Sequence, residues 1–320
     1  MGSRTARAAG LLLGWLADEA FGDPARLHPV AGFGSAAAAL ERKTYAGSRA
    51  AGTGHVAVLV TTTAAAGLLI ERGTRSRPWL QTLLTAVATW TVLGGRSLRR
   101  EAEAIRQLVA VDDLPGARHR IRNLVGRDPS ELDADDLARA TIESVAENTA
   151  DAVVAPIAWG AVAGVPGLLT YRAINTLDAM IGHRNARYTR FGWAAARLDD
   201  VANWVPARVA ALLTAAAAPI VGGHPGTALR TVATDAHRHP SPNAGRVEAA
   251  FAGALGIRLG GINAYAGQVE DRGTLGDGPR PTVADIPRAN RLAASVAALS
   301  TALACFALAR GGLRWFSHKQ

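Results

Sequence analysis

The feature that most constrains the fold is a set of long apolar runs with few charged residues. They are Val56–Ile70, Trp79–Gly95, Val201–Val221 and Leu292–Ala309. A helix that crosses a bilayer needs about 20 predominantly apolar residues. The first two runs are 15 and 17 residues long, and the first reaches spanning length when it is extended back to Ala50. The runs predict an all-α fold, a polytopic helical membrane protein. Buried helices of a soluble bundle are the alternative for the first two runs.

Composition supports a membrane protein and narrows the partners. Apolar residues make up 49% of the chain and charged residues 19%, whereas a soluble protein has about 25% charged residues. The net charge of +9 comes almost wholly from arginine, because Lys43 and Lys319 are the only lysines. This charge suits phosphates, carboxylates or lipid headgroups. No basic run is interleaved with aromatic residues, so nucleic acid is not expected as a partner. The single Cys305 excludes a disulfide framework.

The pattern predicts one membrane-embedded helical domain over residues 1–320. Arg4 and Arg7 precede the apolar run Ala8–Ala17, which we interpret as a retained first helix. The expected segments are N-terminal spans (1–95), an aqueous helical hairpin broken at 114–116 (96–136), a core motif region (137–222), a polar loop region (223–291), and a last span with a basic tail (292–320). Ser130 is the candidate N-cap of the helix that opens the core region. The basic tail predicts a cytoplasmic C-terminal end.

Three carboxylates mark the opening of the core region. Glu143, Glu147 and Asp151 are spaced four residues apart, so in a helix they share one face. Like charges at this spacing disfavour a helix by a few tenths of a kcal/mol per pair. The row therefore needs a counter-charge, which a divalent metal or a cationic substrate would supply.

A second polar group follows within residues 175–203. Its amides, carboxylates and guanidinium groups alternate with apolar residues that are expected to be buried. Because buried polar groups need partners, so many together indicate a site. Its members are Asn175, Asp178, Arg184, Asn185, Arg187, Tyr188, Arg197, Asp199, Asp200 and Asn203. Other candidates lie beside prolines or at a helix start, namely Asp23, His28, Arg127, Ser241 and Asn243.

These residues occur in motifs that resemble the cobalamin-biosynthesis CobD/CbiB family, adenosylcobinamide-phosphate synthase. The motifs follow the family order over nearly the whole chain: Gly22-Asp23-Pro24, His28-Pro29-Val30, Arg127-Asp128, Glu143–Asp151, Asn175-Thr176-Leu177-Asp178, Ala196–Asp200 with Asn203, Ser241-Pro242-Asn243 and Leu259-Gly260-Gly261. The departures are Ala152, Ala179 and the pair Arg246-Val247.

The resemblance implies an integral membrane acid–amine ligase. Such an enzyme joins adenosylcobyric acid to (R)-1-amino-2-propanol O-phosphate, or to free aminopropanol, with ATP and Mg²⁺ as cofactors. It implies a multi-pass protein of the cell membrane with a cytoplasmic-facing site, the lipid bilayer as a partner, and other corrinoid-pathway enzymes as further candidate partners.

The resemblance also implies roles for the candidate residues. Glu143, Glu147 and Asp151 would hold Mg²⁺. Asp178, Asp199 and Asp200 would be further ligands or the base. The phosphate contacts would be Arg184, Arg187 and Arg197, and the amides that orient substrate would be Asn148, Asn175 and Asn203. The other substrate-binding candidates are Asp23, His28, Arg127, Asn185, Tyr188, Ser241 and Asn243.

Two other functional classes stay open from the sequence. A transporter or channel would place acids within its spans to carry protons or cations, and it would show an internal repeat, which the sequence lacks. A non-catalytic membrane scaffold for corrinoid enzymes would tolerate substitution of Asn148 and Asp178.

Overall fold

A computed structural model describes residues 3–24, 28–126, 128–183, 185–265 and 268–310, with only the backbone described for 262–265 and 268–270. The chain is mostly helical, which confirms the predicted fold class. It divides into two compact units, each described here by itself. Unit 1 is Met1–Gly94, Ala155–Ala202 and Ser300–Gln320, and unit 2 is Gly95–Val154 and Asn203–Leu299.

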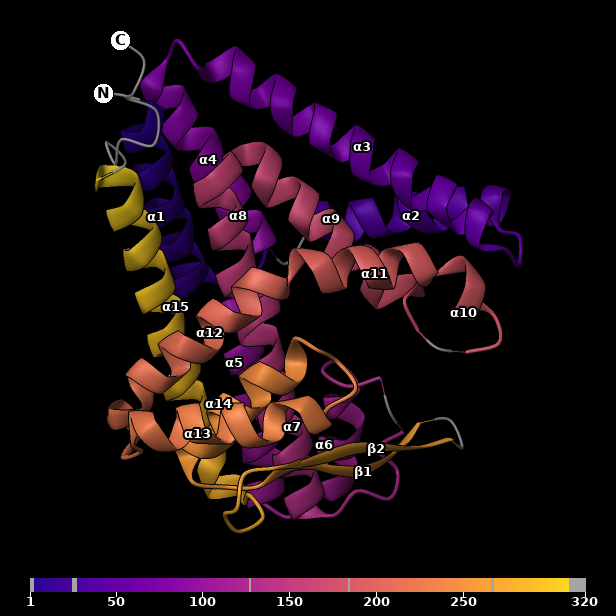
Figure 1. The fold of residues 1–320 in the computed structure, drawn as a ribbon, viewed down its shortest axis with the longest axis vertical. Coiled ribbons are helices and arrows are strands. Elements are labelled where there is room, and N and C mark those ends of the chain that lie inside the picture. The colour runs from indigo at the N-terminus through magenta and orange to yellow at the C-terminus, as the bar shows by residue number, and fades with distance from the viewer. Residues whose placement is uncertain (1–2, 25–27, 127, 184, 266–267, 311–320) are drawn as a thin grey trace. The chain divides into compact units, whose positions relative to one another are not determined.

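Unit 1 is built from helices. They are α1 (Ser3–Phe21), α2 (Pro29–Thr44), α3 (Arg49–Thr74), α4 (Pro78–Val92), α8 (Ala155–Ala163), α9 (Val165–Ile181), α10 (Tyr188–Phe191) and α11 (Trp193–Ala202). Helices α1 and α4 lie side by side (Figure 1). Gly10 and Gly14 of α1 face Thr85 and Thr89 of α4, and a Cβ atom at either glycine would overlap the threonine. Small residues thus allow the two backbones to approach closely.

A partly buried carboxylate joins three helices of unit 1. Glu71, near the end of α3, accepts hydrogen bonds from Arg7 of α1 at 3.0 Å and from Gln81 of α4 at 2.9 Å. Its second oxygen accepts from the Val165 amide at the start of α9 at 3.1 Å. The amide of Val165 belongs to the first turn of α9, where it has no partner within the helix. Glu71 therefore fixes these helix ends against one another.

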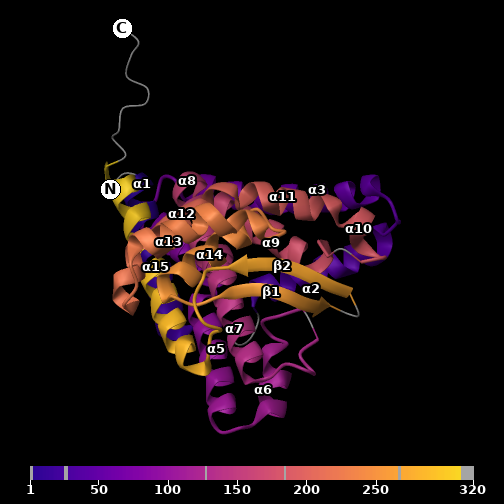
Figure 2. The same ribbon diagram turned by 60° about the horizontal axis from the view of Figure 1, so that its bottom comes forward.

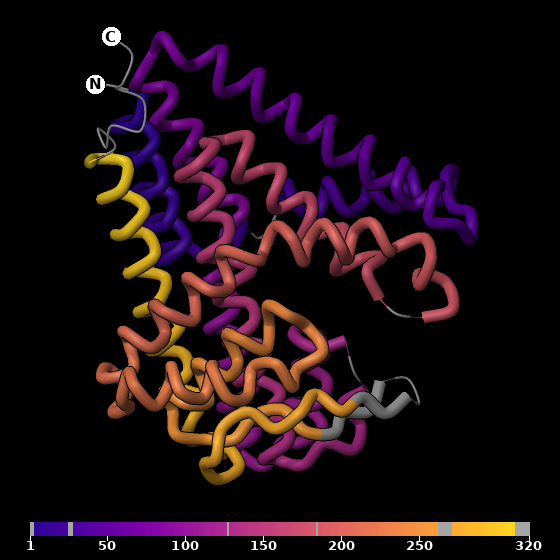
Figure 3. The backbone as a smooth tube through the Cα atoms, viewed as in Figure 1, coloured from indigo at the N-terminus to yellow at the C-terminus, as the bar shows by residue number. Residues whose placement is uncertain are grey.

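Unit 2 combines helices with a short hairpin. Its elements are α5 (Gly95–Ala110), α6 (Leu114–Ile121), α7 (Ala134–Thr149), a π-helical turn (Ala150–Val154), α12 (Trp204–Ala217), α13 (Pro225–Asp235), α14 (Ala244–Leu255), β1 (Leu259–Tyr265), β2 (Gln268–Leu275) and the first part of α15 (Ile286–Arg310). Short 3₁₀ turns lie at Ala218–Val221, Ala236–Arg238 and Val283–Asp285. Every residue of α14 except Arg246 is buried, so α14 lies in the core of this unit (Figure 3).

The hairpin is the main departure from the all-α expectation. Strands β1 and β2 are antiparallel and pair Leu259 with Leu275 (Figure 2). The register shifts between Gly260 and Ile262. Gly260 and Gly261 adopt φ of 79° and 91°, a backbone conformation that favours glycine. The segment expected to be a polar loop therefore contains ordered helices and strands.

Three helical segments are long and apolar enough to cross a membrane, among the described residues. They are Arg49–Thr74, Trp204–Val221 and Val283–Arg310. In the most apolar window of the first segment only 17% of residues are buried within the protein. Exposing so much apolar surface to water is unfavourable, so this helix is suited to contact with lipid. The run expected from Trp79 to Gly95 forms α4, which has 15 residues.

Two expected helix boundaries were wrong. The helix that opens the core region has Asp133 rather than Ser130 as its N-cap, and the Asp133 side chain accepts from the Asp136 amide at 2.7 Å. Asp is as good an N-cap as Ser, and two further acids in the first turn favour the start at this position. The break in the charged hairpin lies before Leu114, where Asp113 caps α6.

Candidate functional site

The acidic row is carried by α7 and the π-helical turn that follows it. Glu143 and Glu147 lie one turn apart on α7, and Asp151 lies in the π turn. Pro156 lacks an amide hydrogen and its ring would clash with the carbonyl four residues earlier in an α-helix. A wider turn relieves this conflict, and such π turns are frequent at functional sites. The predicted helix is confirmed, while the widening at Asp151 was not expected.

Glu143 is buried and tied to the hairpin. Its residue surface is only 3% exposed, and its Oε1 accepts from the Gly260 amide at 2.9 Å. Arg139, one turn earlier on α7, lies 3.5 Å from the same oxygen and donates to the Gly260 carbonyl at 2.6 Å. Arg139 also pairs with Asp136 at 3.2 Å. The counter-charge expected for this member of the row is therefore an arginine of the same helix.

Glu147 lies in a different environment. Its side chain is partly exposed, yet burial of the carboxyl raises its pKa above the ordinary range, an effect that Arg272 opposes and Glu143 increases. A cation brought near this carboxyl would reverse the shift, because a positive charge favours the ionised form. Asp151 is also partly exposed.

The metal prediction can be compared with these contacts. No group of three or more His, Cys, Asp or Glu residues in the described part of the chain is arranged to hold a metal ion. Glu143 already engages Gly260 and Arg139. Mg²⁺ is commonly held by one or two carboxylates together with substrate phosphates and water. Glu147 and Asp151 fit that donor set, and a ligand role for Glu143 stays a prediction.

Asn148 is oriented by its own helix. Its Nδ2 donates to the Ser144 carbonyl at 2.9 Å and to the Ser144 hydroxyl at 3.2 Å. The Ser144 hydroxyl in turn donates to the Leu124 carbonyl at 3.2 Å. The amide predicted to orient substrate is thus held in one direction by the backbone of unit 2.

A serine turn begins α14. The Ser241 hydroxyl accepts from the amides of Asn243 and Ala244 at 3.3 and 3.1 Å. Asn243 occupies the N-cap position and is buried. The two predicted substrate-binding residues of this segment therefore belong to one turn.

Sequence reasoning missed a buried pair behind this turn. His239 Nδ1 accepts from the Ser241 amide at 3.0 Å, and His239 Nε2 lies 3.6 Å from Oε1 of Glu248, which is fully buried. Burial, reinforced by the positive charge of Arg272, lowers the pKa of His239 to about 4. A signal was present, because Glu248 is the only charged residue between Val247 and Leu255.

In unit 1 the predicted residues Asn175 and Asp199 meet. Asn175 Nδ2 lies 3.4 Å from Asp199 Oδ1, joining α9 to α11. Arg172, which the sequence reasoning missed, donates to Asn175 Oδ1 at 3.5 Å. Arg197 pairs with Asp200 at 3.4 Å near the surface.

A second polar group of unit 1 centres on Glu41, which was also missed. Its Oε1 accepts from Arg187 at 2.8 Å and from the Tyr188 hydroxyl at 3.1 Å. The Arg187 guanidinium also lies over the Tyr45 ring, 4.3 Å from its centroid. Asn185 Oδ1 accepts from the Tyr188 amide at 2.8 Å. Arg187 is thus an ion-pair partner in this structure, and its predicted phosphate role is untested.

The remaining predicted residues are dispersed. His28 is the N-cap of α2 and accepts from the Val30 amide at 3.2 Å. Asp23 is partly buried, Asp178 lies on α9, and Asn203 is buried at the N-cap of α12 in unit 2. Arg127 and Arg184 lie outside the described residues. The α7 acids were also predicted to lie close to Asp199 and Asp200. These two groups belong to different units, so their closeness stays a prediction.

Comparison with known proteins covers almost the whole chain. A family model described as CobD/Cbib protein matches residues 11–293. Cobalamin biosynthesis protein CobD of Mycobacterium tuberculosis is 54% identical over 298 residues, which cover 93% of this chain and 95% of that protein. The proteins of the same name from Chromobacterium violaceum and Geobacter metallireducens are 43% and 40% identical, and each match covers 87% of this chain and 89% of the relative. No solved structure matches.

Proposed function

Because the chain belongs to the CobD/CbiB family, we propose that it joins adenosylcobyric acid to (R)-1-amino-2-propanol O-phosphate, or to the free amino alcohol, in an ATP- and Mg²⁺-dependent reaction. The chain is a membrane protein of cobalamin biosynthesis and acts at the adenosylcobinamide-phosphate synthase step. The match across residues 11–293 carries the proposal, because this range contains the α7 acids, the Asn175–Asp199 pair and the serine turn.

The reaction needs an activated acid. A carboxylate and an ammonium do not form an amide at neutral pH. In the proposed reaction a propionate oxygen of the corrinoid attacks the γ-phosphate of ATP, which gives an acyl phosphate and ADP. The deprotonated amine then attacks the acyl carbon, the amide bond forms and phosphate leaves. Such a sequence calls for groups that bind phosphates and for a base.

The acids of α7 are the candidates for the phosphate side of this chemistry. Glu147 and Asp151 are the candidate Mg²⁺ ligands, and a bound Mg²⁺ would neutralise charge on the nucleotide phosphates. Glu143 acts through Arg139 and Gly260, holding the acidic face of α7 against the hairpin. Asn148, fixed by Ser144, would orient a carboxyl or amide group.

Asp199 is the leading candidate for the base. Asp199 is oriented by Asn175, and a carboxylate in this position can take a proton from the ammonium of the amine. Asp178 and Asp200 are the other candidates. We place the site on the cytoplasmic side, where ATP is available and where the basic residues Arg310, Arg314 and Lys319 are favoured.

The test is direct assay of the purified protein in detergent with corrinoid acid, each amine, and Mg-ATP. Mass spectrometry should detect the amide, with one ADP formed per amide. Glu147→Gln and Asp151→Asn should each lower kcat by about 100-fold or more, whereas Glu103→Gln, at the surface of α5, should leave it unchanged. Full ligase activity of Glu147→Gln would refute the role of the acidic row.

A further inference from the structure

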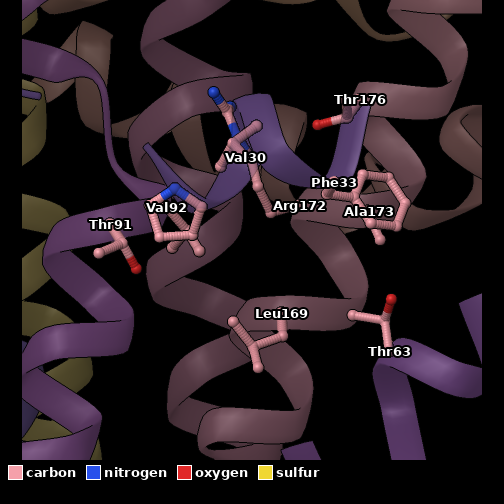
Figure 4. A pocket seen from close by; sticks show the side chains of 10 residues that line it. Val30, Phe33, Thr63, Thr91, Val92, Leu169, Arg172, Ala173 and Thr176 are labelled. Carbon is pink, nitrogen blue, oxygen red and sulfur yellow. The ribbon is translucent and has the colours of Figure 1, made fainter. Parts of the chain in front are cut away.

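Unit 1 contains a small cavity that no role assigned above uses. It has a volume of about 80 Å³ and lies among the start of α2, α3, α4 and α9 (Figure 4). Its lining is Pro29, Val30, Phe33, Thr63, Thr91, Val92, Leu169, Arg172, Ala173 and Thr176. The cavity is therefore mostly apolar, with three hydroxyls and a single guanidinium group.

The guanidinium of Arg172 lies at one end of the cavity. In the view of Figure 4 the Arg172 side chain extends past Val30, and its guanidinium lies at the end opposite Leu169 and Thr63. Arg172 is partly exposed. A guanidinium in an apolar cavity favours an anion with planar or bidentate acceptors, such as a phosphate ester or a carboxylate. The opposite end, where Leu169 lies with the Thr63 hydroxyl, favours a small group with both apolar and polar atoms.

The size of the cavity selects among the substrates of the proposed reaction. Sites for drug-sized ligands span about 300–1,000 Å³, so a cavity of about 80 Å³ is well below that range. A corrinoid or a complete nucleotide does not fit within it. The three-carbon amino alcohol, with or without its phosphate, is the substrate closest to the cavity in size.

The cavity is also connected to the candidate base. Arg172 donates to Asn175 Oδ1 at 3.5 Å, and Asn175 Nδ2 lies 3.4 Å from Asp199 Oδ1. A phosphate held at Arg172 would therefore keep a short attached amine within the neighbourhood of Asp199. The three residues form a chain that runs from an anion-binding group to a proton acceptor.

Resting on the proposed function, we propose that this cavity is the subsite for the phosphorylated amino alcohol, and that Arg172 binds its phosphate and makes the enzyme prefer it to the free amino alcohol. The methyl group of the substrate would contact Leu169. Arg172 is then a specificity-determining residue of the ligase reaction.

The experiment compares both amines in wild type, Arg172→Met, Arg172→Lys and the matched control Arg75→Met, which alters an exposed arginine after α3. Steady-state rates and isothermal titration give KM, kcat and Kd for each amine. Arg172→Met should weaken binding of the phosphorylated amine by about 10- to 100-fold and change binding of the free amine by less than twofold. Arg172→Lys should recover part of the loss, and Arg75→Met should match wild type.

A second variant tests the cavity without removing the charge. Ala173→Leu adds volume inside the cavity and should raise KM for both amines while KM for the corrinoid acid stays unchanged. Equal losses on both amines in Arg172→Met, or wild-type binding that does not distinguish the two amines, would overturn the proposal. An unchanged amine KM in Ala173→Leu would also overturn it.

The outcomes separate this inference from the proposed function and from a lipid site. If wild type makes no amide with either amine, the proposed function itself fails. If wild type is active but Arg172→Met keeps its preference for the phosphorylated amine, only the subsite fails. Native mass spectrometry in phosphatidylglycerol nanodiscs tests the other source of a phosphate. A phospholipid retained by wild type and lost in Arg172→Met, with amine KM unchanged, would assign the cavity to lipid.

Discussion

Replacing Glu143 by alanine tests how α7 is held against the hairpin. The change removes the acceptor of the Gly260 amide, 2.9 Å away, and the carboxylate beside Arg139. Both partners are then left in a buried region, since Gly260 is buried and the Arg139 side chain is only 12% exposed. We expect Glu143→Ala to lower the free energy of unfolding and to loosen β1.

The expected magnitude follows from the two partners. A buried amide without an acceptor costs about 1–3 kcal/mol, and removing one partner of a buried ion pair costs about 3–5 kcal/mol. Arg139 keeps its contacts with Asp136 and the Gly260 carbonyl, so the total should lie near the lower end, at about 3 kcal/mol. Glu143→Gln keeps an acceptor for Gly260 and should cost about 1 kcal/mol.

The assay combines denaturant unfolding in detergent micelles with hydrogen exchange at the Gly260 amide. Glu103→Gln is the matched control, because Glu103 pairs with Arg106 on the surface of α5 and such pairs contribute less than about 1 kcal/mol. The Gly260 amide should exchange at least tenfold faster in Glu143→Ala and remain nearly as protected in Glu143→Gln. Wild-type stability and unchanged Gly260 exchange in Glu143→Ala would refute the reasoning.

Three further predictions concern stability, measured by unfolding in detergent. The pKa of His239 is lowered to about 4 in the folded protein. As the pH falls below about 6.5, this histidine is therefore protonated in the unfolded chain while it stays neutral in the folded protein. Stability should be full above about pH 6.5 and fall by up to about 3 kcal/mol as the pH drops toward 4. A His239→Gln variant with the same pH profile would contradict this. Gly52→Ala should destabilise the protein because its Cβ would overlap the Phe191 carbonyl, whereas Gly54→Ala meets open space and should be neutral. Glu71→Ala removes the acceptor shared by α1, α4 and α9 and should cost more than about 2 kcal/mol; a loss below 0.5 kcal/mol would contradict it.

The helices could be predicted from the sequence because their signals are local. The apolar runs give α3, α12 and α15, and the first helix lies where Ala8–Ala17 indicated it. The family motifs could be assigned to helices because the helix signals around them are also local. The acidic spacing gave a helix through Glu147 because side chains four residues apart share a face whatever the tertiary context.

The hairpin could not be predicted because its stabilising contacts are not local. Glycine at 260 and 261 weakens a strand signal, and Asp271 and Arg272 make the second strand polar. The hairpin is held to α7 through Gly260, whose amide and carbonyl bind Glu143 and Arg139. These partners are separated by more than a hundred residues, so the pairing is absent from any short window of sequence.

The acidic row shows how a correct local pattern can leave out neighbouring groups. The three acids seemed equivalent because only their mutual spacing was considered, although Arg139 stands four residues before Glu143 on the same face. In the structure Glu143 is neutralised by that arginine, whereas burial raises the pKa of Glu147. Asp151 is set apart by the π turn. A cation that enters this region therefore gains most at Glu147 and Asp151, because attraction to Glu143 would have to displace an existing ion pair. We therefore propose Glu147 and Asp151, rather than Glu143, as the members of the row that take part in the chemistry.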